Sequence, residues 1–198
     1  MLDEVNGMSE LLASDLFEGR SRNHWAPKPI PPGVLGAIYD LARMGPTSMN
    51  CQPARFLFII SEQEKARLAP HLMEGNRLKA LGAPCVAIIA HDPLFYEHLP
   101  RIFPIREGMR EMFAGNNSLT EVTAFRNGTL QGAYFMIAAR ALGLDCGPMS
   151  GFNNASVDQE FFAETGYRSN FICALGYADD TPFPRLPRLP FADACSVI

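Results

Sequence analysis

The sequence lacks the features that mark several whole classes of protein. No stretch approaches the ~18 consecutive apolar residues that a membrane-spanning helix requires. Residues 1–20 hold acids without the apolar run of a signal peptide or the pattern of a transit peptide. The five cysteines form no Cys-x-x-Cys pair, which argues against a disulfide framework and against a zinc ribbon. We therefore expect a cytoplasmic protein with reduced thiols, no bound metal and no membrane contact.

An excess of positive charge is also lacking. The chain carries 17 basic and 21 acidic residues, a net charge of −4, which argues against a bulk electrostatic grip on nucleic acid. A local basic site for one small anion stays open. Of the 198 residues, 47% are hydrophobic and 19% are charged, and neither a repeat nor a linker divides them. The composition predicts one core-forming domain over residues 1–198.

The standard catalytic motifs are missing as well. There is no His-Glu-x-x-His, Gly-x-Ser-x-Gly, Walker or Gly-x-Gly-x-x-Gly pattern, so a hydrolase, a P-loop enzyme and a Rossmann site lose support. We assign no catalytic residue. His91 and Asp92 follow an apolar run, and we favour a polar pair that meets solvent at a strand end over a metal ligand or general base. Cys51 is interpreted as a small neutral filler and not as a reactive thiol.

Helical periodicity is present in three segments: residues 8–17, residues 32–45, and residues 120–142 with Gly143 as the stop. Ser61 with Glu64, and Ser156 with Gln159, are predicted capping boxes that open two more helices.

Short apolar runs at residues 55–60, 85–90 and 171–175 predict strands, and the first two suit strands buried on both faces. Residues 179–190 hold four prolines, so we expect an extended tail and not a helix. Helices that alternate with buried strands predict an α/β layered domain.

Polar loops punctuate this apolar scaffold. Arg20, Ser21, Arg22 and Asn23 place two guanidiniums and a hydroxyl within four residues, which suits a phosphate clamp or, equally, a solvated loop. Residues 45–53 offer many hydrogen-bond donors and acceptors that can recognise a heterocycle, although a plain capping loop has the same composition.

Two more polar features stand later in the chain. Asn76 and Lys79 are one helical turn apart and share a face. Residues 147–151 (Gly-Pro-Met-Ser-Gly) form a tight loop whose backbone can approach a ligand closely.

Together these loops resemble the FMN-dependent nitroreductase family, in the family's order and along nearly the whole chain. The Pro46-Thr47-Ser48-x-Asn50-x-Gln52-Pro53 loop is similar to the one that approaches the flavin there. Asn23 departs from the pattern, because many relatives have Lys or Arg at that position. The resemblance implies cofactor-binding roles for Arg20, Ser21, Arg22, Asn23, Pro46, Thr47, Ser48, Asn50, Asn76, Lys79, Pro148, Met149, Ser150, Gly151, Arg185 and Arg188.

Within that family, more specific motifs resemble the short malonic semialdehyde reductases of pyrimidine degradation. These motifs are Phe95-Tyr96-Glu97-x-Leu99-Pro100, Glu121-x-Thr123-Ala124-Phe125-Arg126-Asn127, Gly147-Pro148-Met149-Ser150-Gly151-Phe152 and Arg185-Leu186-Pro187-Arg188-Leu189.

The resemblance implies a nitroreductase-like α/β fold with a central mixed sheet flanked by helices, and a homodimer with FMN at its interface. NADPH or NADH would reduce FMN, and malonic semialdehyde would reoxidise it to give 3-hydroxypropionate in ping-pong order. The alternatives are a broad-specificity nitroaromatic or quinone reductase, and a flavin-binding protein without turnover.

The aromatic- and arginine-rich segment 92–115 is interpreted in two ways. It can form a lid over the flavin, with one arginine, among them Arg106 and Arg110, paired to a substrate carboxylate. It can equally be an aromatic patch at the dimer interface with surface arginines.

Overall fold

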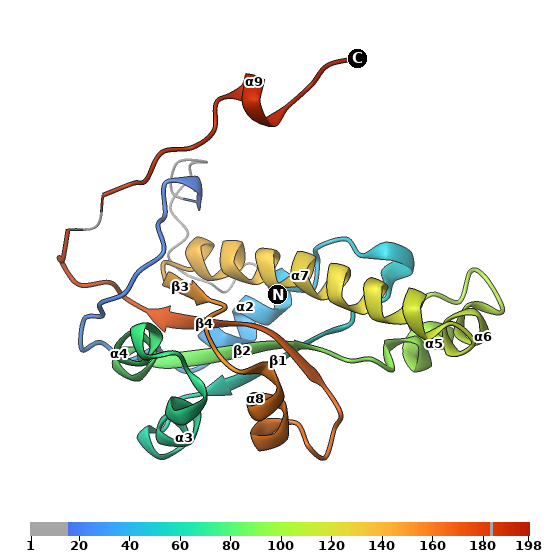
Figure 1. The fold of residues 1–198 in the computed structure, drawn as a ribbon, viewed down its shortest axis with the longest axis horizontal. Coiled ribbons are helices and arrows are strands. Elements are labelled where there is room, and N and C mark those ends of the chain that lie inside the picture. Colours follow the sequence, from blue (N-terminus) through green and yellow to red (C-terminus); the bar gives the residue numbers. More distant parts are fainter. Residues whose placement is uncertain (1–15, 183) are drawn as a thin grey trace.

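The computed structural model describes residues 16–182 and 184–198 (Figure 1). The strands are β1 (Ala54–Ile59), β2 (Cys85–His91), β3 (Asp145–Met149) and β4 (Arg168–Gly176). The α-helices are α2 (Val34–Ala42), α3 (Glu62–Leu68), α4 (Glu74–Gly82), α5 (Leu99–Ile102), α6 (Met109–Ala114), α7 (Asn117–Ala141), α8 (Asn154–Phe161) and α9 (Phe191–Ala194). The 3-10 helices are η1 (Ser48–Asn50), η2 (Ala69–His71) and η3 (Phe95–His98). The helix expected at residues 8–17 lies largely outside the described residues.

The four strands form one sheet in the order β1-β2-β4-β3, and every neighbouring pair is antiparallel. The expected α/β layers are confirmed, but the sheet is less mixed than we expected. Among the described residues, parallel pairing is limited to an isolated bridge between Ser21 and Cys146. The central strands β2 and β4 are separated by residues 92–167, which include α7, β3 and α8.

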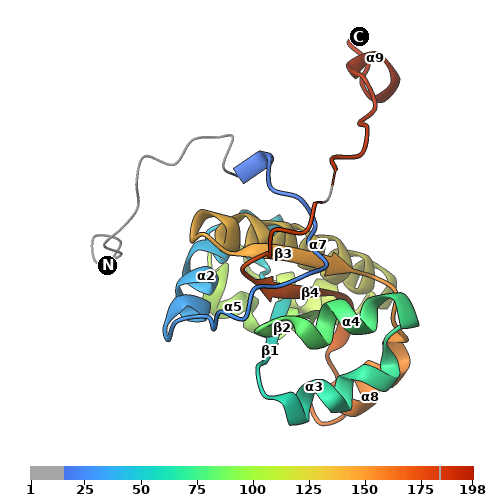
Figure 2. The same cartoon turned by 90° about the vertical axis from the view of Figure 1, so that its left-hand side faces the viewer.

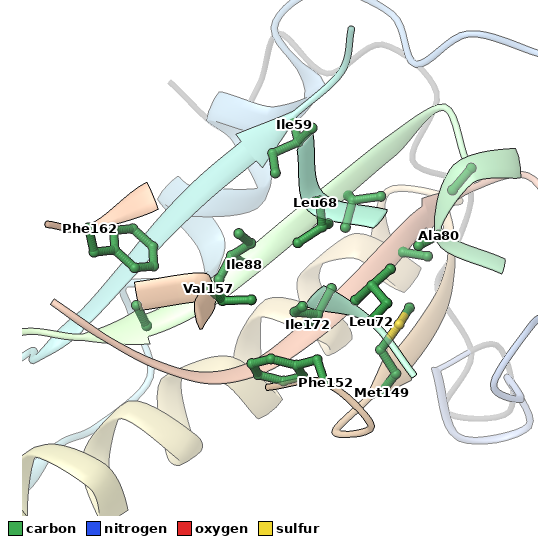
Figure 3. Close-up of a cluster of buried hydrophobic side chains, with 14 residues drawn as sticks. Ile59, Leu68, Leu72, Ala80, Ile88, Met149, Phe152, Val157, Phe162 and Ile172 are labelled. Atoms are coloured by element: carbon green, nitrogen blue, oxygen red, sulfur yellow. The ribbon is translucent and has the colours of Figure 1, made fainter. Parts of the chain in front are cut away.

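Helices cover both faces of the sheet, with α2 and α7 on one side and α3, α4 and α8 on the other (Figure 2). Successive residues of a strand point to opposite faces. In β2, Ile88 therefore joins the cluster with Leu68 of α3 and Val157 of α8 (Figure 3), whereas its neighbour Ile89 packs with Phe135 of α7. Each central strand supplies two separate cores.

The long helix α7 begins three residues before its predicted start. Asn116 caps it, because the Asn116 side chain accepts a hydrogen bond from the backbone N–H of Leu119. Gly143, with φ 78°, follows its end as predicted. At Gly132 a Cβ atom would lie 2.6 Å from the Phe171 ring, so a glycine is needed where α7 crosses β4.

The capping interpretation is right for α3 and wrong for α8. Ser61 accepts a hydrogen bond from the backbone N–H of Glu64 at 3.2 Å, as predicted. In α8 the cap is Asn153, whose side chain accepts from the N–H of Ser156, so Ser156 lies inside the first turn. Asn and Ser both suit a cap, and here the cap is Asn153, three residues before Ser156.

The tail is extended between residues 179 and 190 where the structure describes it, as the prolines predict. It leaves the body of the molecule and ends in the short helix α9 (Figures 1 and 2). Its described residues from 184 onward are all exposed.

Candidate functional site

Two of the predicted polar segments meet at the β3 edge of the sheet. The backbone N–H of Arg22 donates to the carbonyl of Cys146 at 2.9 Å, and Ser21 bridges to the same strand residue. The Arg22 guanidinium donates to the Asp145 carboxylate at 3.2 Å. Residues 20–23 are thereby fixed along β3 and do not form a free solvated loop.

Helix α4 adds its predicted polar face to the same place. The Asn76 side-chain amide donates to the carbonyl of Gly151 at 2.9 Å, and the Lys79 ammonium donates to the carbonyl of Pro148 at 3.2 Å. The two side chains lie one turn apart, as their spacing predicted, and together they hold the segment that follows β3. We call residues 20–23, Asn76, Lys79 and residues 147–151 the α4–β3 site.

Two glycines make this close packing possible. A Cβ atom on Gly147 would lie 2.5 Å from the carbonyl oxygen of Arg22 and 3.2 Å from the Lys79 side chain. A Cβ on Gly151 would lie 2.5 Å from the Asn76 amide nitrogen. The indole N–H of Trp25 donates to the carbonyl of Lys79 at 2.9 Å, which ties the N-terminal segment to α4. Glycine is therefore required at 147, where the obstacle is a backbone atom, whereas a side chain at 151 would displace the Asn76 amide.

The α4–β3 site concentrates positive charge. Arg20 and Arg22 are half-buried, and Lys79 is 8% exposed. Burial lowers the pKa of Lys79, and the nearby Cys173 opposes this effect. Two of the three ammonium N–H bonds of Lys79 have no acceptor among the described residues and are available to a ligand. Such a donor set suits an anion with several acceptor atoms.

The two predicted tail arginines differ. Arg185 donates to the carbonyls of Phe17 and Glu18, at 3.2 and 2.6 Å, just before Arg20 in the chain. Arg188 donates to the carbonyls of Leu186 and Pro187 within the tail itself. The structure therefore brings Arg185 toward the N-terminal segment and leaves Arg188 with the projecting tail.

The predicted loop at residues 46–50 lies elsewhere. In Figure 1 it connects α2 to β1 toward the α5 end of the molecule, whereas α4 and β3 lie at the opposite end. Met49 and Asn50 have positive φ, both 51°. The Asn50 amide donates to the carbonyl of Ile102, and the Ser48 N–H donates to the Asn127 side chain, at 2.8 Å each. Within one chain, Pro46, Thr47, Ser48 and Asn50 are not brought to the α4–β3 site.

His91 and Asp92 are buried, at 5% and 6% exposure, so the expected solvent-facing pair is wrong. Asp92 accepts from Arg55 at 2.6 Å, and this ion pair compensates its burial. Burial lowers the pKa of His91, and the charge of Arg168 lowers it further. The Nδ1 atom of His91 has no hydrogen-bond partner in the described structure.

Cys51 behaves as the neutral filler that we expected. It is fully buried beside Phe95 and Phe113, and burial raises its pKa to about 11. A thiol with that pKa holds its proton at neutral pH.

The segment 92–115 contributes to a core cluster within the chain, which neither interpretation predicted. Its rings Phe95 and Phe113 are buried and pack edge to face against each other, 5.0 Å between centroids, so they belong to a core and not to a free lid. Arg110 forms two 2.7 Å hydrogen bonds to the Glu97 carboxylate and is not free for a substrate. Arg106 is exposed near the turn between α5 and α6.

Sequence reasoning missed three residues that shape the α4–β3 site. Trp25, Met73 and Asp145 contact its segments: Trp25 and Asp145 do so through hydrogen bonds, and Met73 donates its N–H to the carbonyl of Gly151 at 3.0 Å. The single tryptophan of the chain was the available signal, because a unique large ring beside a polar segment is often a packing anchor.

In the part of the chain that the structure describes, no helix is both long and apolar enough to cross a membrane. No group of three or more His, Cys, Asp or Glu side chains in residues 16–182 and 184–198 is placed to hold a metal ion.

Comparisons with known proteins agree with the sequence resemblance. A family model described as the nitroreductase family matches residues 20–177. A protein of Cupriavidus pinatubonensis with the provisional name NADH dehydrogenase/NAD(P)H nitroreductase is 51% identical over 94% of this chain and 97% of its own length. HadB of Ralstonia pickettii, with the same provisional name, is 51% identical over 94% and 96%.

Solved structures share the fold at low sequence identity. A provisionally named nitroreductase of Exiguobacterium sibiricum, crystallised in complex with FMN, superposes with a TM-score of 0.85 at 23% identity and covers 96% of this chain and 99% of its own. The enone reductase CLA-ER, of a gut-bacterial fatty acid saturation metabolism, superposes with a TM-score of 0.83 at 17% identity, over 96% of this chain and 99% of its own.

Proposed function

The chain belongs to the nitroreductase family, and from this premise we propose that it is an FMN-dependent NAD(P)H oxidoreductase that reduces malonic semialdehyde to 3-hydroxypropionate. The observation that carries the cofactor is the convergence of Arg22, Asn76 and Lys79 on residues 145–151. The FMN-bound neighbour from Exiguobacterium sibiricum supports the same cofactor.

The residues present fit FMN in their chemistry. Its phosphate, about two negative charges, needs guanidinium donors, and Arg20, Arg22 and Arg185 lie on or beside one segment. Its ring and ribityl chain need amide and ammonium donors, which Asn76 and Lys79 supply. When bound, FMN supplies the hydride chemistry, accepting from NAD(P)H and giving to the second substrate in ping-pong order.

The chain's own part is to bind and orient. Lys79 would hold positive charge beside the polar edge of the cofactor and favour negative charge there. The backbone at 147–151, held against α4 by Asn76 and Lys79, would keep one wall of the site rigid. Because Lys79 is buried, its charge acts with little screening by water.

We propose that the working form is a cytoplasmic homodimer with two sites at its interface. Residues 46–50 lie at the opposite end of the molecule from the α4–β3 site, so a second copy is needed for both sets to meet one ligand. The solvent face of α7 carries an apolar stripe that a partner can cover: Leu119, Val122, Phe125, Leu130 and Tyr134. The exposed tail, which carries Arg188, projects away from the body of its own chain (Figure 1).

The substrate is proposed from the motifs at residues 95–100 and 121–127. An arginine is expected to pair with the carboxylate of malonic semialdehyde, and Arg106 is the better candidate because Glu97 already binds Arg110. The alternatives are a nitroaromatic or quinone reductase of broad specificity, which the names of the relatives favour, and a flavin-binding protein without turnover.

The decisive test is anaerobic. FMN-loaded protein is mixed with NADPH or NADH, and then with malonic semialdehyde, while the flavin absorbance is followed. We expect bleaching by the nicotinamide and recovery on addition of the aldehyde. Recovery with nitroaromatics or quinones alone would replace the substrate, and no bleaching with either nicotinamide would leave only a flavin-binding protein.

The carboxylate partner is tested by Arg106→Ala, with Arg110→Ala as its matched control. We expect Arg106→Ala to raise KM for malonic semialdehyde by at least tenfold, the cost of a lost charge-assisted hydrogen bond. KM for a neutral quinone should not change. Equal effects of Arg106→Ala on both substrates would contradict the pairing.

A further inference from the structure

A cavity with a volume of about 670 Å³ lies at the C-terminal end of α4, beside residues 26–33. Its lining includes the proline-rich segment that contains Pro27, Pro29 and Pro32, together with Leu81 at the end of α4 and Pro84 just after it. Its volume falls in the range of roughly 300–1,000 Å³ that is usual for small-molecule sites. The lining is mainly apolar, so an occupant needs an apolar body.

One buried charge faces this apolar lining. Lys65 of α3 lines the cavity, and its side chain is only 5% exposed. Its ammonium donates to the Glu62 carboxylate at 2.9 Å. The other two ammonium N–H bonds have no acceptor in the part of the chain that the structure describes. A buried ammonium with unmet donors favours a ligand that brings acceptor atoms.

The present partner of Lys65 is easily displaced. The Glu62 side chain is 84% exposed, so it stands at the rim and is well hydrated in either position. An ion pair with so exposed a member contributes little to stability. Lys28, also in the lining, adds a second positive charge above the Tyr177 ring. Two ammonium groups against one carboxylate make the cavity net positive.

We infer that this cavity binds a monocarboxylate with an unbranched apolar chain of medium length, whose carboxylate pairs with Lys65 and whose chain lies between the proline segment and α4. A phosphate would leave most of its oxygens without donors in so apolar a lining, and a cation would meet the Lys65 charge. The inference does not depend on the proposed oxidoreductase function.

The test is isothermal titration calorimetry of the purified protein with hexanoate, octanoate, octanol and octylammonium. Octanoate is expected to bind once per chain and saturably. Hexanoate, two methylenes shorter, should bind roughly tenfold more weakly. Octylammonium should show no saturable binding. No saturable binding of octanoate at millimolar concentration, or equal binding of octanol and octanoate, would overturn the inference.

Two variants locate the binding. Lys65→Met keeps the apolar stem of the side chain and should weaken octanoate at least tenfold, without effect on octanol. Glu62→Gln removes the competing carboxylate and should tighten octanoate, whereas Glu74→Gln, an exposed acid of the next helix, should change nothing. Unchanged octanoate affinity in Lys65→Met, or weaker binding in Glu62→Gln, would contradict the site.

Trp25 can report binding in the cavity through its fluorescence. Gly82 lines the cavity, and a Cβ atom there would lie 3.6 Å from Trp25, the single tryptophan of the chain. Octanoate should therefore shift the Trp25 emission in the wild type with the calorimetric affinity. If octanoate binds only elsewhere, for example at the α4–β3 site, the Lys65→Met variant will bind it with wild-type affinity. That result would reject the cavity as the site.

Discussion

Lys79 places a buried positive charge at the α4–β3 site. Its contribution to FMN affinity can be measured separately from its contribution to folding. Lys79→Met keeps the apolar stem but removes the ammonium that donates to the Pro148 carbonyl. Since hydrogen bonds to charged groups contribute about 1.5–3 kcal/mol, we expect FMN affinity to fall roughly 10- to 100-fold. Arg77→Met, an exposed change on the same helix, is the control. An unchanged FMN dissociation constant in Lys79→Met would contradict the proposed role.

His91 predicts a dependence of stability on pH. Burial lowers its pKa in the folded state below the ordinary value of 6.5, so the unfolded chain binds the proton more readily. The contribution to stability is therefore present above about pH 6.5 and is lost as the pH falls below that value. The slope is at most about 1.4 kcal/mol per pH unit, and it ends at the lowered folded pKa.

The measurement is the free energy of unfolding by urea between pH 5 and pH 8. His91→Gln should flatten the acid side of the profile, whereas His24→Gln, at an exposed position, should leave it unchanged. If both variants keep the wild-type slope, another group causes the acid sensitivity.

At the scale of the elements, the contact between β3 and the N-terminal segment depends on one missing methyl group. Gly147→Ala would put a Cβ atom 2.5 Å from the Arg22 carbonyl oxygen. Because that oxygen belongs to the backbone, it cannot move aside without a cost in free energy. We expect a loss of about 1–3 kcal/mol in the free energy of unfolding and weaker FMN binding.

Gly75→Ala is the matched control for that change. Gly75 lies in α4, where an added Cβ meets nothing within 4 Å, so alanine should be neutral or add up to about 1 kcal/mol. Urea unfolding of both variants is the check. A Gly147→Ala protein as stable as Gly75→Ala would mean that the segment shifts without cost.

Most elements could be predicted from periodicity, and the exceptions have local causes. Strand β3 was expected to be a loop, because Gly147 and Pro148 both have low strand propensity. Proline is tolerated there because β3 is the last strand of the sheet, where a missing N–H leaves no ladder partner unsatisfied. The burial of Asp92 could not be predicted, because it depends on Arg55 of β1, thirty-seven residues earlier in the chain. That of His91 depends on Phe125 of α7, whose ring packs edge to face against the imidazole.

The candidate site was predictable in its parts and not in its assembly. The shared face of Asn76 and Lys79 follows from helix geometry alone. That these two side chains hold residues 148–151 follows from the pairing of strands far apart in the chain, which no local pattern encodes. The separation of residues 46–50 from the α4–β3 site likewise appears only in three dimensions.

For the whole molecule, the apolar stripe on α7 predicts the state of association. Leu130 is 46% exposed on that stripe, so Leu130→Glu should place a charge in the proposed interface and yield a monomer that loses FMN. Leu78→Glu, at an exposed leucine on α4, should stay dimeric. Light scattering coupled to size-exclusion chromatography measures the mass of each variant in solution. If the wild-type protein is itself a monomer, the proposed dimer is wrong.

The strand order also determines when each strand can pair while the chain is being synthesised. β1 and β2 can pair as soon as both are made, but the other edge of β2 waits for β4, whose first residue, Arg168, comes 77 residues after His91. At roughly 5–20 residues per second, the ribosome needs about 4–15 s to make that stretch. For those seconds the edge of a strand that is apolar from Cys85 to Ala90 is open to other nascent chains. Slowing translation between residues 91 and 168 should therefore increase aggregation of newly made protein, whereas slowing it after residue 176 should not.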